Sequence, residues 1–285
     1  MSAEAQTCPA LDAKELDRLR GLCRQARIDL LRSIANAGAG HTGGAMSLVE
    51  IVTALYFRVM RVDPARPDWP ERDRFILSKG HSSPGLYAAL AARGYFPKER
   101  LSEFDVAGGM LQGHPDMLKT PGIDMSTGSL GQGLSVGIGM ALAGRLKGLN
   151  VRVFVLAGDG EMQEGQVWEA AMYAGFHKVS RLVLIVDCNS IQLTGRTDET
   201  LSLAPLAGKL EAFGWRCVEC DGHDLADLVP ALERAVAVED GPVCVIARTE
   251  KGHGVSFIAN RVEWHAKAPT PEQLAQAIAE LEGAK

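Results

Sequence analysis

The second half of the chain alternates continuous apolar runs with segments of helical periodicity. Apolar runs at 151–157 and 181–187 flank a helical segment at 163–176. After a long loop the same order returns, with a strand-like run, a helical segment and a second run at 216–220, 225–238 and 243–248. Strands that are apolar on both faces and separated by helices predict a parallel sheet with helices on both faces. We therefore expect an α/β fold with its ligand site at the carboxyl ends of the strands.

The first third of the chain is predicted to be mainly helical. Apolar residues recur at helical spacing over 11–37 and over 47–60, on either side of a break expected at Gly43–Gly44. Further along, we expect a proline-rich loop at 63–70 and a short strand at 74–77. We also expect a helix from Gly80 onward that runs through 86–92, and a C-terminal helical tail at 270–285. No linker or internal repeat is apparent, so we predict one domain over residues 1–285, with a helical N-terminal segment at about 10–60.

Composition excludes several classes of function. The 285 residues are 46% apolar, and 30 Lys and Arg against 35 Asp and Glu give a net charge of −5, without the basic surface expected of a protein that binds nucleic acid or anionic membranes. No signal peptide or membrane span is evident, which favours a cytoplasmic protein. Six cysteines suit buried reduced thiols. Cys217 and Cys220 lie three apart in a strand-like run, on opposite faces, which argues against a metal or redox pair.

Polar residues directly follow two neighbouring apolar runs. Asp159, between Gly158 and Gly160, follows the first, and Asn189 follows the second 30 residues later (189 − 159). Carboxylate and amide oxygens suit Mg²⁺, which is commonly completed by the phosphates of a ligand, and the two glycines let the backbone approach a diphosphate. Taken alone, the Gly-Asp-Gly tripeptide is equally typical of a turn in which Asp caps a helix.

Competing phosphate-binding motifs do not fit. Gly139 to Gly144 has the spacing of a P-loop start, but Arg145-Leu146 stands where Lys-Ser/Thr is required, and no strand precedes it. The glycines at 131, 133, 137 and 139 likewise miss the dinucleotide-binding spacing.

Five of the seven histidines lie in short segments that contain glycine or proline. These segments are Gly40 to Gly44, Lys79-Gly80-His81, Gly113-His114-Pro115, Gly222-His223 and Lys251 to Gly254. Loops often carry catalytic groups on a rigid scaffold. No His-Glu-x-x-His spacing occurs, so a zinc cluster is not expected. We interpret His223 and His253 as structural or supporting residues, and His177, at a predicted helix end, as structural.

Gly158-Asp159-Gly160, followed after the 30-residue spacing by Asn189, resembles the thiamine diphosphate fingerprint shared by transketolases and their relatives, with Cys188 where many members have asparagine. Matches to transketolase in the family's order extend this resemblance over almost the whole chain. They are Gly40 to Gly44, Arg72 to His81, Gly113 to Pro115, Thr127 to Gly133, and Trp264-His265 near Ala268-Pro269.

The resemblance implies a role for individual residues. Mg²⁺, which Ca²⁺ or Mn²⁺ may replace, would be bound by Asp159, Asn189 and the backbone oxygen of Ile191. The other implied cofactor-binding residues are His81 and His265 near the diphosphate, Gly128 and Leu130 along the thiamine, and Gly158, Gly160 and Glu161 around the Gly-Asp-Gly turn. His41, His114 and His265 would line the substrate channel, with His41 and His265 moving protons. Glu164 would lie at the interface between two active-site halves.

The resemblance also implies a partner. In transketolases the glutamate that activates the thiamine pyrimidine lies on a second domain, which this sequence does not include. We therefore expect the N-terminal subunit of a split transketolase, transferring a two-carbon ketol unit between sugar phosphates. A C-terminal subunit with the pyrimidine-binding domain would complete it, in a heterotetramer.

Three alternatives stay open. The pair could act on a specialised sugar phosphate or sulfo-sugar, since split forms recur in specialised catabolism. A 2-oxo acid dehydrogenase E1 subunit shares the fingerprint, although the histidine segments favour transketolase. A non-enzymatic regulatory relative that binds the cofactor is the third alternative.

Overall fold

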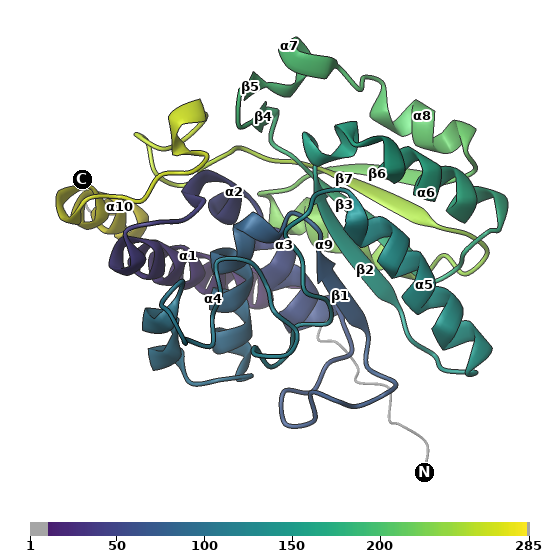
Figure 1. The fold of residues 1–285 in the computed structure, drawn as a ribbon, viewed down its shortest axis with the longest axis horizontal. Helices are drawn as coiled ribbons and strands as arrows, with labels where there is room; N and C mark the ends of the chain where they lie inside the picture. The colour runs from purple at the N-terminus through teal and green to yellow at the C-terminus, as the bar shows by residue number, and fades with distance from the viewer. Residues whose placement is uncertain (1–10, 284–285) are drawn as a thin grey trace.

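The computed structural model describes residues 11–283, and its centre is a parallel five-stranded sheet (Figure 1). The order across the sheet is β1 (Arg74–Leu77), β2 (Val153–Gly158), β3 (Leu182–Cys188), β7 (Val243–Arg248) and β6 (Arg216–Asp221). Every pair of neighbours in it is parallel. The predicted α/β fold is therefore confirmed, and the expected strands differ from the observed ones by no more than two residues at either end.

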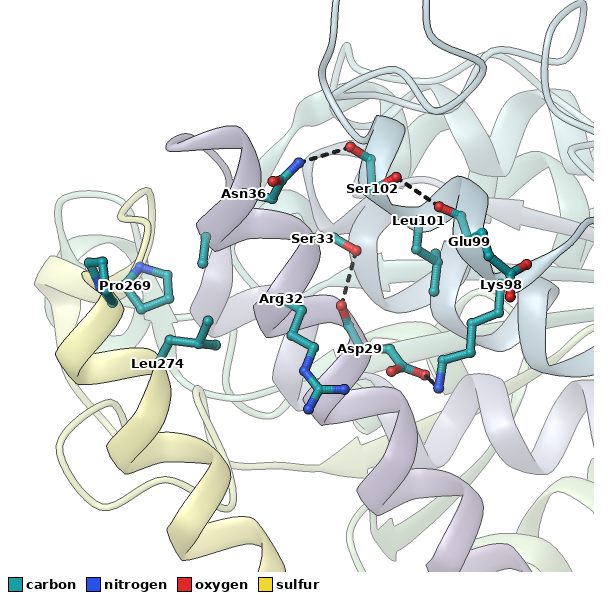
Figure 2. Close-up of a pocket in the computed structure, with 12 residues that line it drawn as sticks. Asp29, Arg32, Ser33, Asn36, Lys98, Glu99, Leu101, Ser102, Pro269 and Leu274 are labelled. Carbon is teal, nitrogen blue, oxygen red and sulfur yellow. Dashed lines mark hydrogen bonds and ion pairs between the residues drawn. The ribbon is translucent and has the colours of Figure 1, made fainter.

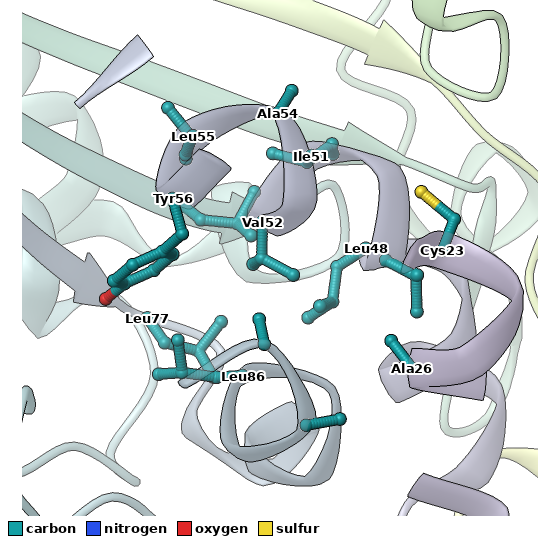
Figure 3. Close-up of a cluster of buried hydrophobic side chains, with 14 of the residues drawn as sticks. Cys23, Ala26, Leu48, Ile51, Val52, Ala54, Leu55, Tyr56, Leu77 and Leu86 are labelled. Carbon is teal, nitrogen blue, oxygen red and sulfur yellow. The ribbon is translucent and has the colours of Figure 1, made fainter. Parts of the chain in front are cut away.

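Helices cover both faces of the sheet, as the apolar runs indicated. Alternate side chains of β2 enter different cores: Phe154 and Leu156 pack with α1, α3, α4 and α9, whereas Val153 and Val155 pack with α5, α6 and α8. The helices are α1 (Ala13–Ala37), α2 (Thr42–Ser47), α3 (Val49–Ala54), α4 (Ser83–Arg93), α5 (Gln132–Leu146), α6 (Gly165–Phe176), α7 (Thr197–Leu201), α8 (Leu206–Ala212), α9 (Leu225–Val236) and α10 (Pro271–Glu282). Figure 3 shows part of the first core, between α1, α3, α4 and β1.

The predicted helix break at Gly43–Gly44 is wrong, because α2 runs through both glycines. A Cβ at Gly43 would lie 2.9 Å from Lys251 Cγ, and one at Gly44 would lie 2.9 Å from Ser82 Oγ. These glycines therefore allow close packing instead of ending a helix. The expected helix at 47–60 is also divided, into α3 and a π-helical turn, η1 (Leu55–Val59).

Short elements complete the chain. The long loop before β6 contains a two-residue antiparallel pair, β4 (Ile191–Gln192) and β5 (Gly195–Arg196), together with α7 and α8. These elements are too short to produce a clear periodicity in the sequence. The described residues also form 3-10 helices, namely η2 (Gly80–Ser82), η3 (Lys98–Glu103), η4 (Glu161–Gln163) and η5 (Val262–Trp264).

The described cysteines are free, as expected, but only Cys23, Cys220 and Cys244 are buried, whereas Cys188 and Cys217 are half-buried. Cys23, Cys188, Cys217, Cys220 and Cys244 are all free, and Cys8 lies outside the described residues. Cys220 packs in the core with α9, whereas Cys217 packs in the core with α8, so the two point to opposite faces of the sheet. Among residues 11–283 no helix is both long and apolar enough to cross a membrane.

Candidate functional site

A cavity of about 420 Å³ lies at the carboxyl ends of β1, β2 and β3, where ligands bind in sheets of this kind. Every residue predicted for the site lines it: His41, His81, His114, Gly128, Leu130, Gly158, Asp159, Gly160, Glu161, Glu164, Asn189, Ile191 and His265. They come from loops that are up to 224 residues apart (265 − 41). The fold therefore brings the predicted residues together around one cavity.

A larger cavity, of about 640 Å³, lies elsewhere, between α1, η3 and the start of α10 (Figure 2). None of the predicted site residues lines it. Several of its polar groups already bond one another: Lys98 pairs with Asp29 at 2.8 Å, and Asn36 donates to the carbonyl of Ser102 at 2.9 Å. We therefore place the candidate site in the smaller cavity, which holds the chemically active side chains.

Asp159 is a buried carboxylate at the end of β2, with only 8% of the residue exposed. Its oxygens accept hydrogen bonds from the amides of Ser190 (2.7 Å) and Gly160 (3.0 Å) and from Thr197 Oγ1 (3.2 Å). No salt bridge to Asp159 occurs within residues 11–283. Burial and the neighbouring Asp187 raise the pKa of Asp159 above its ordinary value. A cation beside this carboxylate would compensate its charge.

Two neutral oxygens lie close to Asp159 in the cavity wall. Asn189 Oδ1 accepts from the amide of Ile191 at 3.2 Å, and the Ile191 carbonyl accepts from Lys251 Nζ at 2.8 Å. The ammonium group of Lys251 thus already bonds the Ile191 carbonyl, which is one of the predicted metal ligands. The combination of carboxylate, amide and carbonyl oxygens is the ligand type that a hard divalent ion prefers. No cluster of three His, Cys, Asp or Glu side chains suited to a metal occurs in the described part of the chain. A metal here would therefore need backbone and ligand oxygens as well.

Asp187, one strand further along, is fully buried but well compensated. It pairs with Lys79 Nζ and accepts hydrogen bonds from Ser47 Oγ (2.6 Å) and from Thr249 Oγ1. Burial alone would raise the pKa of Asp187, but Lys79 and these hydroxyls hold it below its ordinary value. Lys79 also donates to the carbonyl of Gly44 at 3.0 Å, which fixes α2 against the sheet.

Glu161 holds the glycine segments around the cavity together. Its buried carboxylate accepts from Ser78 Oγ at 2.5 Å and from the amides of Gly131 and Gly158 at 2.8 and 3.1 Å. The carboxylate of Glu161, which was predicted to bind the cofactor, is therefore already hydrogen-bonded within the protein. Direct contact with a ligand would be left to the backbone of Glu161.

Three of the cavity histidines have pKa values below the ordinary value. The ring centroids of His41, His81 and His265 lie 4.9 to 5.5 Å apart, and His114 lies 6.5 Å from His41. Burial, with help from Lys79 and Lys251, lowers the pKa of His81 to about 2 and, in the same way, that of His265 to about 3. Burial, His114 and Lys251 also lower the pKa of His41. These three rings are therefore neutral near pH 7.

Lys79 and Lys251 are cavity residues that the sequence analysis did not identify. Burial and the charge of Lys79 lower the pKa of Lys251 to about 8, against the opposing effect of Asp159 and Asp187, and Lys251 Nζ lies 2.6 Å from His265 Nδ1. Each lysine directly precedes a Gly-His pair, so the repeated Lys-Gly-His could have identified both. Lys79 is paired with Asp187, whereas the buried ammonium group of Lys251 bonds the neutral Ile191 carbonyl and His265, so Lys251 favours an anionic ligand.

The cavity wall and rim complete the site. A Cβ at Gly128 would lie 3.3 Å from His114 Cδ2, and one at Gly160 would lie 3.0 Å from Gln192 Cβ, so the glycines allow close backbone packing there. Glu164, predicted to lie at an interface, is exposed at the start of α6.

A family model described as the thiamine diphosphate binding domain of transketolase matches residues 20–282. The chain belongs to this family. It is 47% identical over 252 residues to the 6-deoxy-6-sulfo-D-fructose transketolase subunit SqwG of Clostridium sp., covering 88% of this chain and 92% of that subunit. It is 43% identical over 271 residues to an apulose-4-phosphate transketolase subunit of Actinobacillus succinogenes, covering 95% and 97% of the two chains.

Longer transketolases match over part of their length. The human transketolase is 37% identical over 275 residues, which are 94% of this chain and 42% of the human protein. The solved transketolase of Leishmania mexicana superimposes with a TM-score of 0.87 at 29% identity, and the Pichia stipitis enzyme in complex with sedoheptulose 7-phosphate with 0.88 at 28%. Both superpositions cover 93% of this chain but only 41% and 40% of those chains. The chain therefore corresponds to less than half of these transketolases.

Proposed function

We propose that this chain is the N-terminal subunit of a split, thiamine diphosphate-dependent transketolase, active only with a C-terminal partner. The similar relatives named as subunits match over 92% and 97% of their length, whereas the human transketolase matches over 42%. The observation that carries the proposal is the buried Asp159, which has no ion-pair partner within residues 11–283 and faces the same cavity as Asn189 and Ile191. That arrangement suits a divalent ion bound together with a diphosphate.

Each group in the cavity has a part in this proposal. Asp159, Asn189 and the Ile191 carbonyl would hold Mg²⁺, and Lys251 would balance part of the diphosphate charge. Bound thiamine diphosphate supplies a nucleophilic carbon and an electron sink for breaking and forming carbon–carbon bonds. The glycine-rich walls exclude bulky side chains from the space that the cofactor would fill.

The histidines would handle protons and hydroxyl groups of the sugar. His41 and His265 are neutral near pH 7, so each can donate one hydrogen bond and accept a proton. Lys79 and Lys251 contribute to the low pKa of His265. An anion bound beside Lys251 would offset its charge and raise the pKa of His265, although burial, the larger cause of the low value, would remain. His81, with its pKa of about 2, suits a neutral hydrogen-bonding role near the diphosphate.

The partner would cover an exposed apolar surface on α5 and α6. Leu146 is 85% exposed and Phe176 is 80% exposed, and Met172 and Tyr173 on α6 are also exposed. Patches of this kind mark protein contacts. The proposed interface residue Glu164 begins the same helix, α6. We propose a heterotetramer of two such pairs, with residues 1–285 as one domain of each, and the free cysteines support a cytoplasmic location.

A specialised sugar is the second candidate substrate, because the relatives named as subunits act, by their names, on 6-deoxy-6-sulfo-D-fructose or apulose 4-phosphate. The groups that would select the sugar's far end are left to the partner. A panel of xylulose 5-phosphate, 6-deoxy-6-sulfofructose and apulose 4-phosphate, with pyruvate added, separates these substrates and tests the 2-oxo acid alternative.

Reconstitution tests the proposal. Ketol transfer is measured with the purified chain, with a C-terminal transketolase subunit encoded beside it, and with both together, in thiamine diphosphate and Mg²⁺. We expect turnover only with both chains, and its loss when EDTA removes the metal. Full activity from this chain alone would contradict the split-subunit proposal, and pyruvate decarboxylation without ketol transfer would favour the dehydrogenase alternative.

A further inference from the structure

A buried ionic network lies outside the cavity, between α1, α3 and the segment 249–254. Arg27 on α1 forms two hydrogen bonds of 2.6 Å with the two carboxylate oxygens of Glu50 on α3. The same carboxylate lies 2.9 Å from Nδ1 of His223, which follows β6. Despite burial, which acts the other way, Arg27 and His223 lower the pKa of Glu50 to about 2. Glu50 is therefore ionised and can only accept hydrogen bonds.

Both nitrogens of His223 are engaged, which fixes its tautomer. Nδ1 faces the ionised Glu50 carboxylate and must carry a proton to bond it, whereas Nε2 accepts from the backbone amide of Glu250 at 2.8 Å. An acceptor nitrogen cannot carry a proton of its own. His223 is thus held as the neutral ring with its proton on Nδ1, stacked 3.7 Å from the ring of His253.

His223 accepts from the amide of Glu250, the residue that immediately precedes Lys251. The Gly252 amide donates to the carbonyl of Gly43 at 3.0 Å, and the Asn260 amide donates to the carbonyl of Lys251 at 2.8 Å. From this fixed backbone the Lys251 side chain reaches the Ile191 carbonyl and His265. The packing is tight, since a Cβ at Gly43 would lie 2.9 Å from Lys251 Cγ. A small displacement of the Glu250 peptide would therefore move the ammonium group.

We propose that His223 is a positioning residue: its Nε2 lone pair holds the Glu250 amide and so directs Lys251 into the cofactor cavity. The role of Lys251 towards the diphosphate rests on the proposed function, whereas the link from His223 to the segment 249–254 does not. The alternative is that His223 only completes the ionic network around Glu50 and packs against His253.

Two substitutions separate these roles. His223→Asn places an amide where Nδ1 lies, so it can still donate to Glu50 but leaves the Glu250 amide without its acceptor. His223→Gln extends its amide to the position of Nε2, so its oxygen can accept from Glu250. If His223 positions the Glu250 amide, His223→Asn should weaken cofactor binding and His223→Gln should restore it. If His223 acts only through Glu50, His223→Gln should weaken binding and His223→Asn should not. His253→Asn is the matched control, because the His253 ring stacks on His223 but, within residues 11–283, bonds the side chain of Glu250 and not its backbone amide.

The first experiment measures Mg²⁺–thiamine diphosphate affinity by calorimetry and hydrogen exchange of the Glu250 amide in the full chain. We expect roughly tenfold weaker binding and faster exchange in His223→Asn, with values near wild type in His223→Gln and His253→Asn. Equal behaviour of the Asn and Gln variants, or greater damage from Gln, would overturn the proposal. If wild type binds no cofactor, the proposed function fails, but exchange at Glu250 still tests the positioning.

Two further measurements test the proposal if a variant fails to fold, or if it weakens binding without acting through Lys251. ¹⁵N NMR of the wild-type chain should show His223 neutral with its proton on Nδ1, and a ring protonated on Nε2 would overturn the proposal. In a Lys251→Met background, His223→Asn should change the cofactor affinity by less than about twofold, because its effect runs through Lys251. A further tenfold loss in that background would show that His223 acts on the site independently of Lys251.

Discussion

The cavity and the ion-paired groups around it contain the same residue types with different partners. We call the ion-paired groups the supports: Lys79 with Asp187, Arg27 and His223 with Glu50, and His253 with Glu250. Asp159 directly follows β2, and Asp187 lies near the end of the neighbouring β3. Asp187 pairs with Lys79 and two hydroxyls, whereas Asp159 has hydrogen bonds but no ion pair within residues 11–283. Their pKa values move in opposite directions, below the ordinary value for Asp187 and above it for Asp159. The charged groups of the supports are paired with one another, whereas Asp159 in the cavity has no ion-pair partner within residues 11–283 and could be balanced by a bound cation.

The histidines divide in a similar way. In the supports, His223 and His253 each bond a glutamate. In the cavity, no carboxylate of residues 11–283 bonds the rings of His41, His81, His114 or His265, and His265 instead faces Lys251. Rings held by a carboxylate have a fixed position and tautomer, whereas the cavity rings keep free nitrogens for a ligand. In this chain a bonded glutamate thus distinguishes His223 and His253 from the histidines of the cavity.

The largest expected effect comes from exchanging the two aspartates in turn. Asp187→Asn removes the partner of a buried ammonium group, so we expect the free energy of unfolding to fall by about 3–5 kcal/mol. Asp159→Asn removes a carboxylate that forms no salt bridge within residues 11–283, so we expect a change within about 1 kcal/mol. Urea unfolding of the cofactor-free variants measures both. Equal losses from the two substitutions would break the distinction between support and cavity.

A smaller effect appears in the pH dependence of stability. The pKa of His81 is about 2 in the folded chain against an ordinary value of 6.5, so between these values the unfolded chain binds a proton that the folded chain does not. The free energy of unfolding should therefore fall as pH drops below about 6.5, by up to about 1.4 kcal/mol per pH unit from this ring. His41 and His265 act in the same direction.

Glu50 provides the matched comparison. Its pKa is about 2 in the folded chain against 4.5, so its stabilisation is complete above about 4.5 and is lost as pH falls towards 2. His81→Gln should flatten the dependence between pH 6.5 and 4.5, and Glu50→Gln should leave the slope there unchanged. Unfolding measured in urea across this range decides the point. An unchanged slope in His81→Gln would mean that the cavity histidines already carry protons.

Most strands and long helices could be predicted, because continuous apolar runs and helical periodicity are properties of short stretches of sequence. The cavity residues were predictable because strand ends in a parallel sheet converge, and because the family resemblance named the loops. The glycines of α2 were misjudged because their reason lies in packing against Lys251 and Ser82, far away in sequence. The contact between Glu50 and His223 joins residues 173 positions apart, so no local sequence pattern predicts it. The roles of Lys79 and Lys251 could not be predicted, because their partners Asp187 and Ile191 are 108 and 60 residues away in the sequence.

The central claim is that this chain alone holds the metal and diphosphate end of thiamine diphosphate. Calorimetric titration of the isolated chain with thiamine diphosphate, with and without Mg²⁺, tests it most directly. We expect binding that requires Mg²⁺ and is abolished by Asp159→Ala and by Asn189→Ala, each of which removes a metal-binding oxygen. The exposed Asp198→Asn, whose carboxylate pairs with Arg196, should bind as wild type does. Binding that is independent of Mg²⁺, or unaltered in both cavity variants, would contradict the account.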